Sequence, residues 1–248
     1  MKTKSILFLV FGLLLNISVG FAQEKRSLSP NDLPDWKRMG SAQISNDGGW
    51  VSYVVKPNVG DGVLHIKNPD LGIDTTFERG YRAQFSAKNN YIVFMIKPQL
   101  DSLRKMKLDE VPKSKQPSDT MAIYVFELDT LMKFDGIKSH KLSSEGSDWL
   151  TFQYKKPQKD APAPKGKKKK KKKKSKKGDA PKSTKKPIKR KTSDLVMFNP
   201  VTGEKTQIKN VNEYTISEYG NRIGYIRSFG DTIDSTGVYW YNTITGIT

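Results

Sequence analysis

The sequence contains no cysteine and only two histidines, His65 and His140. Without cysteine the chain forms no disulfide, offers no thiolate to a metal and carries no lipid on an N-terminal cysteine. It also lacks a Gly-x-Ser-x-Gly stretch, a phosphate-binding glycine-rich loop and a cluster of histidines or carboxylates at metal spacing. We therefore predict no catalytic, cofactor-binding or metal-binding residue in this chain. His65 falls in a predicted strand and His140 in a predicted polar loop, where we expect both histidines to be structural or solvated.

Long apolar runs are equally scarce, and the only one lies at the N-terminus. Lys2 and Lys4 precede an apolar stretch over residues 5–15, and small residues follow up to Ala22. This order predicts a secretory signal peptide over residues 1–22, cleaved between Ala22 and Gln23. The run is shorter than the roughly 20 residues that a membrane-spanning helix needs. We expect the mature protein to be exported to the periplasm or the extracellular space.

Positive charge is abundant, but it is concentrated in one segment. The chain has 44 lysines and arginines against 25 aspartates and glutamates. Residues 155–193 contain 20 of the basic residues and two of the acidic ones, and they include the unbroken lysine run Lys167–Lys174. The remaining chain, with 24 basic and 23 acidic residues, is close to neutral. The net charge of +19 therefore describes this segment and not the folded part.

The lysine-rich segment 155–193 has Ile188 as its single large apolar residue, too little for a core, and several prolines, so we predict that it is disordered. It is either a solvated insertion in a surface loop, which costs little in loop-closure entropy, or a weak electrostatic contact to an anionic partner. Such a partner would be a polyanion, lipid headgroups or envelope polysaccharide. No aromatic residues interleave with the lysines to stack on bases, so specific nucleic-acid binding is not expected.

One motif recurs four times: an apolar residue, a serine, a turn rich in Gly, Asn or Asp, and an apolar run that ends in an aromatic residue. The four serines are Ser45, Ser86, Ser143 and Ser217, and the third copy has one extra residue in its turn. The pattern predicts a β-hairpin in which the serine hydroxyl bonds nearby backbone. Gly or Asn supplies the positive φ that the reversal requires.

Each hairpin is followed by a further strand, turn and strand, as in residues 195–203 and 238–246. Four antiparallel strands per repeat are the composition of a propeller blade. We therefore predict an all-β fold, a partial β-propeller of about four blades over residues 23–248. Because a propeller closes only when its blades cover one another, four blades predict that the sequence is part of a longer ring.

The serines are 41, 57 and 74 residues apart, and only the first spacing matches the ~40–45 residues of a blade repeat. Two insertions explain the longer spacings, one over residues 97–120 and the lysine-rich one over 155–193. Both fall between the second and third strands of a blade. Leu100, Leu103, Met106 and Leu108 recur at roughly helical spacing in the first insertion. They predict a short amphipathic helix packed on the edge of the propeller.

Residues Leu28–Trp36 and Ala42–Gly48 resemble the lead-in and first blade of the prolyl oligopeptidase family, more narrowly its large secreted members from Bacteroidetes-type bacteria. The two insertions are also similar to features of that group, and the resemblance spans Leu28–Thr248. It implies an exported serine peptidase whose propeller caps a C-terminal α/β-hydrolase domain and restricts access to short peptides. The implied catalytic residues lie in that domain, so this chain alone is expected to be inactive. Glu213 and Glu218 do not match the glutamate pair that holds a substrate's amino terminus in some relatives.

Two functions fit these residues. The first is the substrate-gating propeller of such a peptidase. The alternative is a stand-alone TolB-like propeller that binds a protein or glycan in the cell envelope. The reading frame beyond codon 248 separates the two, because only the peptidase requires a Gly-x-Ser-x-Gly segment downstream.

Overall fold

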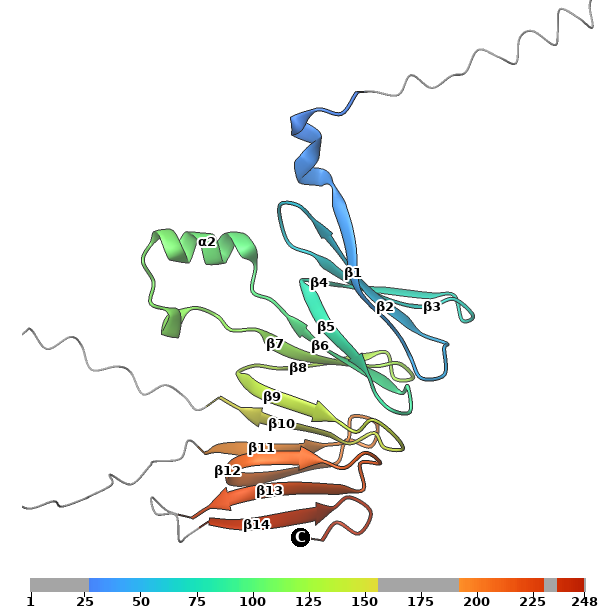
Figure 1. Cartoon of the computed structure of the whole chain (residues 1–248), viewed down its shortest axis with the longest axis vertical. Coiled ribbons are helices and arrows are strands. Elements are labelled where there is room, and N and C mark those ends of the chain that lie inside the picture. The colour runs from blue at the N-terminus through green and yellow to red at the C-terminus, as the bar shows by residue number, and fades with distance from the viewer. Residues whose placement is uncertain (1–26, 156–191, 230–235, 248) are drawn as a thin grey trace, which may run out of the picture. The chain divides into compact units, whose positions relative to one another are not determined.

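The computed structural model describes residues 27–155, 192–229 and 236–247 (Figure 1). The predicted signal peptide and residues 156–191 of the lysine-rich segment lie outside the described residues. The chain divides into two units, residues 1–36 and Lys37–Thr248. The first unit contains a 3-10 helix, η2 (Pro30–Asp35), which begins with a capping box. The backbone amide of Ser29 donates to Asp32 Oδ2 at 2.8 Å, and Ser29 Oγ accepts from the Asn31 amide at 3.3 Å.

The second unit begins with two four-stranded antiparallel sheets, each formed by strands that are consecutive in the sequence. We call each sheet a blade. The strands of blade 1 are β1 (Lys37–Ile44), β2 (Val51–Pro57), β3 (Val63–Asn68) and β4 (Ile73–Glu78). Those of blade 2 are β5 (Gly80–Phe85), β6 (Tyr91–Ile96), β7 (Thr120–Val125) and β8 (Thr130–Phe134). The predicted repeat of four strands is thus confirmed in both blades.

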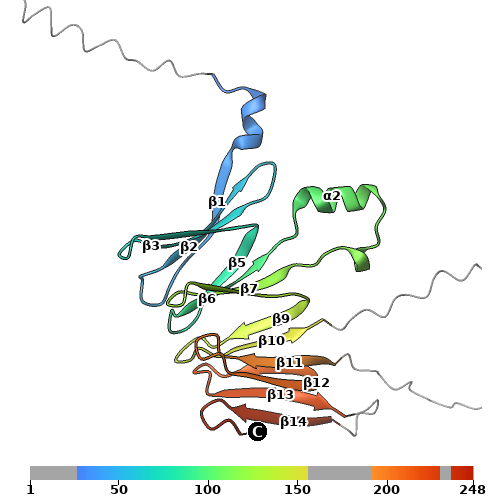
Figure 2. The same cartoon turned by 180° about the vertical axis from the view of Figure 1, so that it is seen from behind.

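The next sheet has six strands, because one long strand belongs to two blades. Its strands are β9 (Ile137–Leu142), β10 (Leu150–Tyr154), β11 (Ser193–Phe198), β12 (Lys205–Ile216), β13 (Arg222–Ser228) and β14 (Thr236–Asn242). The first part of β12 pairs with β11, and its second part pairs with β13. Blade 3 is therefore β9 to the first part of β12, and blade 4 contains the second part of β12 with β13 and β14. Figure 2 shows β12 between β11 and β13 from behind.

The hairpin turns follow the sequence prediction closely. The residue three positions after each serine has a positive φ, with values of 78°, 59°, 69° and 64° at Gly48, Asn89, Gly146 and Gly220. In the first, second and fourth hairpins the serine hydroxyl accepts from the backbone amide five residues on, at 2.9, 3.3 and 3.1 Å. The third hairpin, with its extra residue, differs: Ser143 Oγ donates to the carbonyl of Ser147 at 3.0 Å.

Neighbouring hairpin turns are joined by hydrogen bonds. Asn46 Nδ2 in blade 1 donates to the carbonyl of Ala87 in blade 2 at 3.2 Å. Asn90 Nδ2 in blade 2 donates to Asp148 Oδ2 in blade 3 at 3.0 Å. The amide of Glu145 in blade 3 donates to the carbonyl of Glu218 in blade 4 at 2.9 Å. The four hairpins therefore lie side by side in sequence order, as the propeller interpretation requires.

The hydrophobic core consists of three clusters, and each cluster fills the space between two successive blades. In β6, Tyr91 and Val93 belong to the cluster shared with blade 3, whereas Ile92 and Phe94 belong to the one shared with blade 1. Alternate residues of a strand point to opposite faces of its sheet, so both faces of blade 2 are covered. This explains why β6 and β7 are continuous apolar runs without a polar face.

The first insertion forms the predicted helix, α2 (Leu100–Leu108), and a short 3-10 helix, η3 (Lys113–Lys115). It leaves β6 at the end of the sheet opposite the hairpin turns (Figure 1). The predicted packing of the helix is only partial: no residue of α2 is buried, and Leu108 is 84% exposed. Within the described ranges, no helix has the length and apolar character to cross a membrane.

Candidate functional site

The passage from one blade to the next uses the same backbone conformation three times. The residue between the last strand of one blade and the first strand of the next has a φ of +60° at Arg79, +67° at Gly136 and +62° at Asn210. Each lies seven residues before the serine of its hairpin. Gly and Asn adopt this left-handed region readily, whereas other L-residues pay roughly 1–2 kcal/mol. Arginine is therefore the unfavourable choice at this position of the repeat.

The backbone of Arg79 is held on both sides. Its amide donates to the carbonyl of Gly62 at 2.7 Å, and its carbonyl accepts from the amide of Lys97 at 3.0 Å. Gly136 is held similarly, because its carbonyl accepts from the amide of Lys155 at 2.6 Å. The blade junction thus imposes the backbone conformation of Arg79, and with it the position of its Cα atom and the direction of its Cα–Cβ bond.

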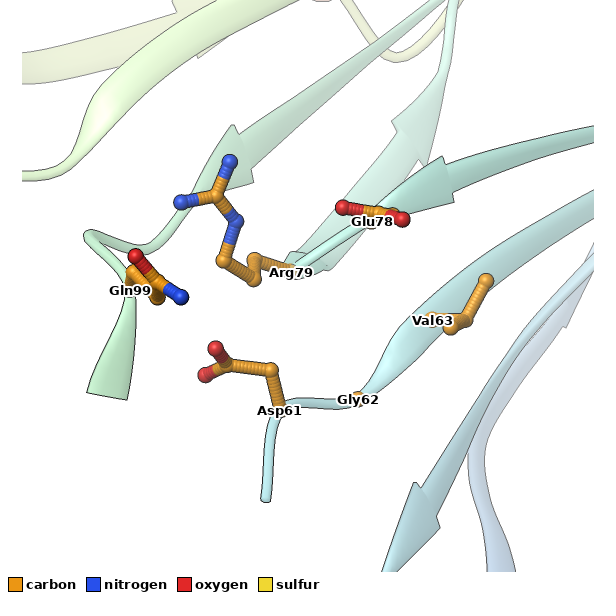
Figure 3. A pocket seen from close by; sticks show the side chains of 6 residues that line it. All are labelled: Asp61, Gly62, Val63, Glu78, Arg79 and Gln99. Carbon is orange, nitrogen blue, oxygen red and sulfur yellow. The ribbon is translucent and has the colours of Figure 1, made fainter. Parts of the chain in front are cut away.

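A cavity of about 410 Å³ opens beside this junction (Figure 3). Its lining comes from the β2–β3 loop, the end of β4 and the residue before α2: Asp61, Gly62, Val63, Glu78, Arg79 and Gln99. Side chains at successive positions of a regular strand point to opposite faces. The left-handed backbone at Arg79 interrupts this alternation, and both Glu78 and Arg79 line the same cavity.

The charged groups in this cavity do not pair with each other. Among the described residues, no ion pair or hydrogen bond engages the side chain of Arg79, and its Nε is buried without a partner. Figure 3 shows the Arg79 guanidinium pointing away from the Asp61 carboxylate, which turns toward Gln99. Asp61 Oδ2 accepts from the amide of Leu100 at 3.2 Å, so its charge is partly offset by the N-terminus of α2.

A second, smaller cavity of about 110 Å³ adjoins the first and shares Asp61, Gly62 and Arg79 with it. Val54 and Leu100 give this cavity an apolar part. Lys97 Nζ lies 4.6 Å from the centre of the Tyr81 ring, and Tyr81 donates a hydrogen bond to Asp119. This bond and the burial of the ring raise the pKa of Tyr81 to about 12, with burial the larger cause.

A third cavity, of about 380 Å³, lies where the first strands of blades 1, 2 and 3 end. Equivalent positions of the repeat line it, since Gln43 and Gln84 stand two residues before their serines. Ile44 and Phe85 stand one residue before. The ends of the first strands of three successive blades therefore share one opening.

The two histidines lie on strands. His65 is in β3, as predicted, and its ring stacks on Tyr53 with centroids 4.9 Å apart. The prediction of a polar loop for His140 is wrong: it lies in β9 and pairs with Phe152 of β10. A loop was expected because the residues around His140 are polar. However, β9 is the first strand of blade 3, and its extended conformation depends on pairing with β10 rather than on its own hydrophobicity.

The surroundings of His140 shift its pKa downward. Burial lowers its pKa below the usual value, and the positive charge of Arg82 in blade 2 lowers it further.

Glu213 lies within β12, and Glu218 lies in the turn that follows β12. In the described ranges, no three histidine, aspartate or glutamate side chains gather as metal ligands.

Sequence reasoning missed Arg79 and Asp61. A signal for Arg79 is present in the sequence, because aligning the repeat on its serines puts Arg79 in the same column as Gly136 and Asn210. An arginine among residues that favour the left-handed region marks the position as unusual. Nothing in the pattern marks Asp61, which reaches the cavity through the β2–β3 loop.

Comparison with known proteins gives similarity to propeller structures only. No family model and no curated protein matches the sequence. The β-propeller domain of the trilobed protease from Pyrococcus furiosus is 11% identical, with a TM-score of 0.43 over 83% of this chain and 53% of that one. Acylaminoacyl peptidase from Pyrococcus horikoshii is 11% identical, with a TM-score of 0.43 over 88% of this chain and 32% of that one. TolB from Acinetobacter baumannii is 11% identical, with a TM-score of 0.36 over 85% of this chain and 42% of that one. The chain thus spans about half or less of the length of these proteins, and none of them assigns a role to a residue here.

Proposed function

We propose that this chain is the β-propeller portion of an exported serine peptidase of the prolyl oligopeptidase type. In this proposal the propeller admits short peptides to a separate α/β-hydrolase domain that carries the catalytic residues. The signal-peptide pattern over residues 1–22 and the lead-in Leu28–Trp36 support export and the family resemblance. The exported protein would act in the periplasm or outside the cell.

The observation that carries the proposal is the cavity shared by the ends of the first strands. Its lining alternates polar and apolar side chains, Gln43 with Ile44 and Gln84 with Phe85, at equivalent places in successive blades. Ile44 is 68% exposed although it is apolar. Propeller blades surround a central channel, and in this proposal the opening lined by repeated positions of several blades is part of that channel. Such a channel excludes peptides and proteins that are wider than its opening.

The test uses the protein expressed from its complete reading frame. We expect a fluorophosphonate probe to label a serine outside the 248 residues, and we expect the present chain alone to remain unlabelled. Absence of labelling in the complete protein would contradict the peptidase proposal, and so would labelling within these 248 residues.

A second experiment tests the channel. Gln84→Trp should narrow the opening and lower kcat/KM for an octapeptide more than for a small ester substrate, because only the longer substrate needs the full width. The matched control is Lys107→Trp on the exposed face of α2. Equal effects of Gln84→Trp on both substrates would remove the channel from the proposal.

The alternative is a stand-alone propeller that binds a protein or glycan in the envelope. Val238 and Trp240 on β14 are 81% and 53% accessible, and Arg222 lies 5.3 Å from the centre of the Trp240 ring. In a longer ring the next blade would cover this face, whereas in a stand-alone propeller the face would be open to a partner. The reading frame that tests the peptidase also tests this alternative, because a stop codon directly after Thr248 would favour it.

A further inference from the structure

We propose that the Arg79 cavity binds a small zwitterion, such as a free amino acid or a dipeptide with both ends unblocked. Arg79 would hold the carboxylate and Glu78 the ammonium group. This inference is independent of the peptidase proposal, because it concerns a site within blades 1 and 2 and is tested by binding to this chain.

Arginine carries a conformational cost at this position of the repeat. The equivalent residues of the next two blade junctions are Gly136 and Asn210, which suit the left-handed backbone. An arginine there is strained by roughly 1–2 kcal/mol. Strained residues cluster at functional sites, and Arg79, unlike Arg82 with its φ of 50°, lines a cavity. The strain therefore directs attention to what the Arg79 side chain meets.

The charged side chains that line this cavity are not paired with one another among the described residues. The Arg79 side chain lines the cavity with a buried, unpartnered Nε, and no ion pair among the described residues joins it to Asp61 or Glu78. Opposite charges that share a cavity but do not pair remain available to a ligand. A guanidinium binds a carboxylate through two parallel hydrogen bonds. Glu78, exposed at the end of β4, is the free carboxylate.

The two acidic residues of the cavity, Asp61 and Glu78, have different surroundings. Asp61 already accepts from the first amide of α2, where the positive end of the helix dipole offsets its charge. It therefore acts mainly as a fixed wall of the cavity. Glu78 has no such helix partner, so the cavity offers one cation and one open anion. That pair matches a ligand with one carboxylate and one ammonium group.

The size of the site fits a small ligand. The cavity of about 410 Å³ is in the range of small-molecule sites. The adjoining cavity of about 110 Å³ is lined by Val54 and Leu100 together with Lys56 and Lys97, so it has both an apolar and a basic part. A dipeptide has a carboxylate at one end and an ammonium group at the other, which suits a cavity lined by one cation and one open anion.

Calorimetric titration of the purified chain tests the proposal with three probes: Ala-Ala, N-acetyl-Ala-Ala and Ala-Ala amide. We expect Ala-Ala to bind, and we expect blocking either end to weaken binding at least tenfold. Arg79→Gln should weaken Ala-Ala at least tenfold and remove the difference between the free acid and the amide. Glu78→Gln should remove the difference between the free and the acetylated amine. Arg82→Gln is the matched control, because Arg82 also has a positive φ, of 50°, but is exposed outside the cavity.

Thermal unfolding supplies a second readout. Arg79→Asn places at this junction the residue type found at Asn210, so its melting temperature should equal or exceed that of the wild type while binding is lost. Three binding results would overturn the proposal: no binding of Ala-Ala, equal binding of the free and blocked dipeptides, or the same affinity in Arg79→Gln and Arg82→Gln. A lower melting temperature for Arg79→Asn than for the wild type would also contradict it, because the arginine would then be a structural residue.

Discussion

At the scale of single residues, the tightest requirement lies where hairpins 3 and 4 meet. Gly220 has a φ of +64°, and a Cβ atom there would lie 2.5 Å from Ser147 Oγ and 3.0 Å from Ser143 Cβ. The Gly220→Ala variant must therefore accept both the left-handed strain and a clash with the neighbouring turn. We expect a loss of about 2–4 kcal/mol in the free energy of unfolding, measured by urea denaturation.

Gly203 provides the matched control for this prediction. It has a similar φ, +77°, but a Cβ atom there meets nothing within 4 Å. Gly203→Ala should therefore cost only the backbone strain, about 1 kcal/mol. If the two variants lose the same stability, the contact between hairpins 3 and 4 contributes nothing to folding.

The pH dependence of stability can be traced to His140. Burial and the charge of Arg82 lower its pKa in the folded protein, so the unfolded chain binds more protons at mildly acidic pH. The stabilisation is complete above the unfolded pKa, near 6.5, and is lost as the pH falls through the lowered folded pKa. His140→Gln should therefore lose less stability than the wild type between pH 7 and pH 5 in urea titrations. Arg82→Gln should raise the pKa of His140, as followed by the imidazole signals in NMR, and an unchanged pKa would exclude Arg82 as a cause.

At the scale of elements, the insertion between β6 and β7 is a loop that the blade does not need. No residue of α2 is buried, and loop closure costs little extra with length. Replacing residues 100–116 with a short Gly-Ser linker should change the free energy of unfolding by about 1 kcal/mol or less. A loss of several kcal/mol on replacing the helix would show that α2 supports the blade after all.

Tyr81→Phe tests the anchor of the insertion, because it removes the hydrogen bond to Asp119. It should lower the free energy of unfolding by about 1 kcal/mol.

The elements also show what the sequence can and cannot predict. The serine-centred hairpins were predictable because Gly48, Asn89, Gly146 and Gly220 are the residue types that a positive φ requires. The division of β12 between two blades was not, because no turn residue interrupts it and only Asn210 marks the junction. The Arg79 cavity was equally hidden. It depends on a loop, a blade junction and an insertion that meet only in three dimensions, and periodicity reports none of these contacts.

At the scale of the whole molecule, the local stability of a blade should depend on how many of its faces are buried against neighbouring blades rather than on its amino-acid composition. Each hydrophobic cluster joins two successive blades, so the second unit resembles a repeat protein, whose stability is a sum of terms between neighbours. Blades 2 and 3 contribute to two clusters each. The described parts of blades 1 and 4 contribute to one each. Strands buried on both faces should therefore open last.

Hydrogen exchange of backbone amides measures this order directly. The amides of β7, where residues 121–125 are all buried, should be among the most protected. Those of β14, in which only Tyr241 is buried, should exchange much faster, and β1, exposed along its whole length, should behave similarly. The physical reason is that opening β14 uncovers one cluster, whereas opening β7 uncovers two. Phe152→Ala in the cluster between blades 2 and 3 should speed exchange in β7 more than in β1 or β14, since β7 contributes to this cluster and the other two strands do not. Uniform protection across β1, β7 and β14 in the wild type would contradict this account and would indicate a single cooperative unit.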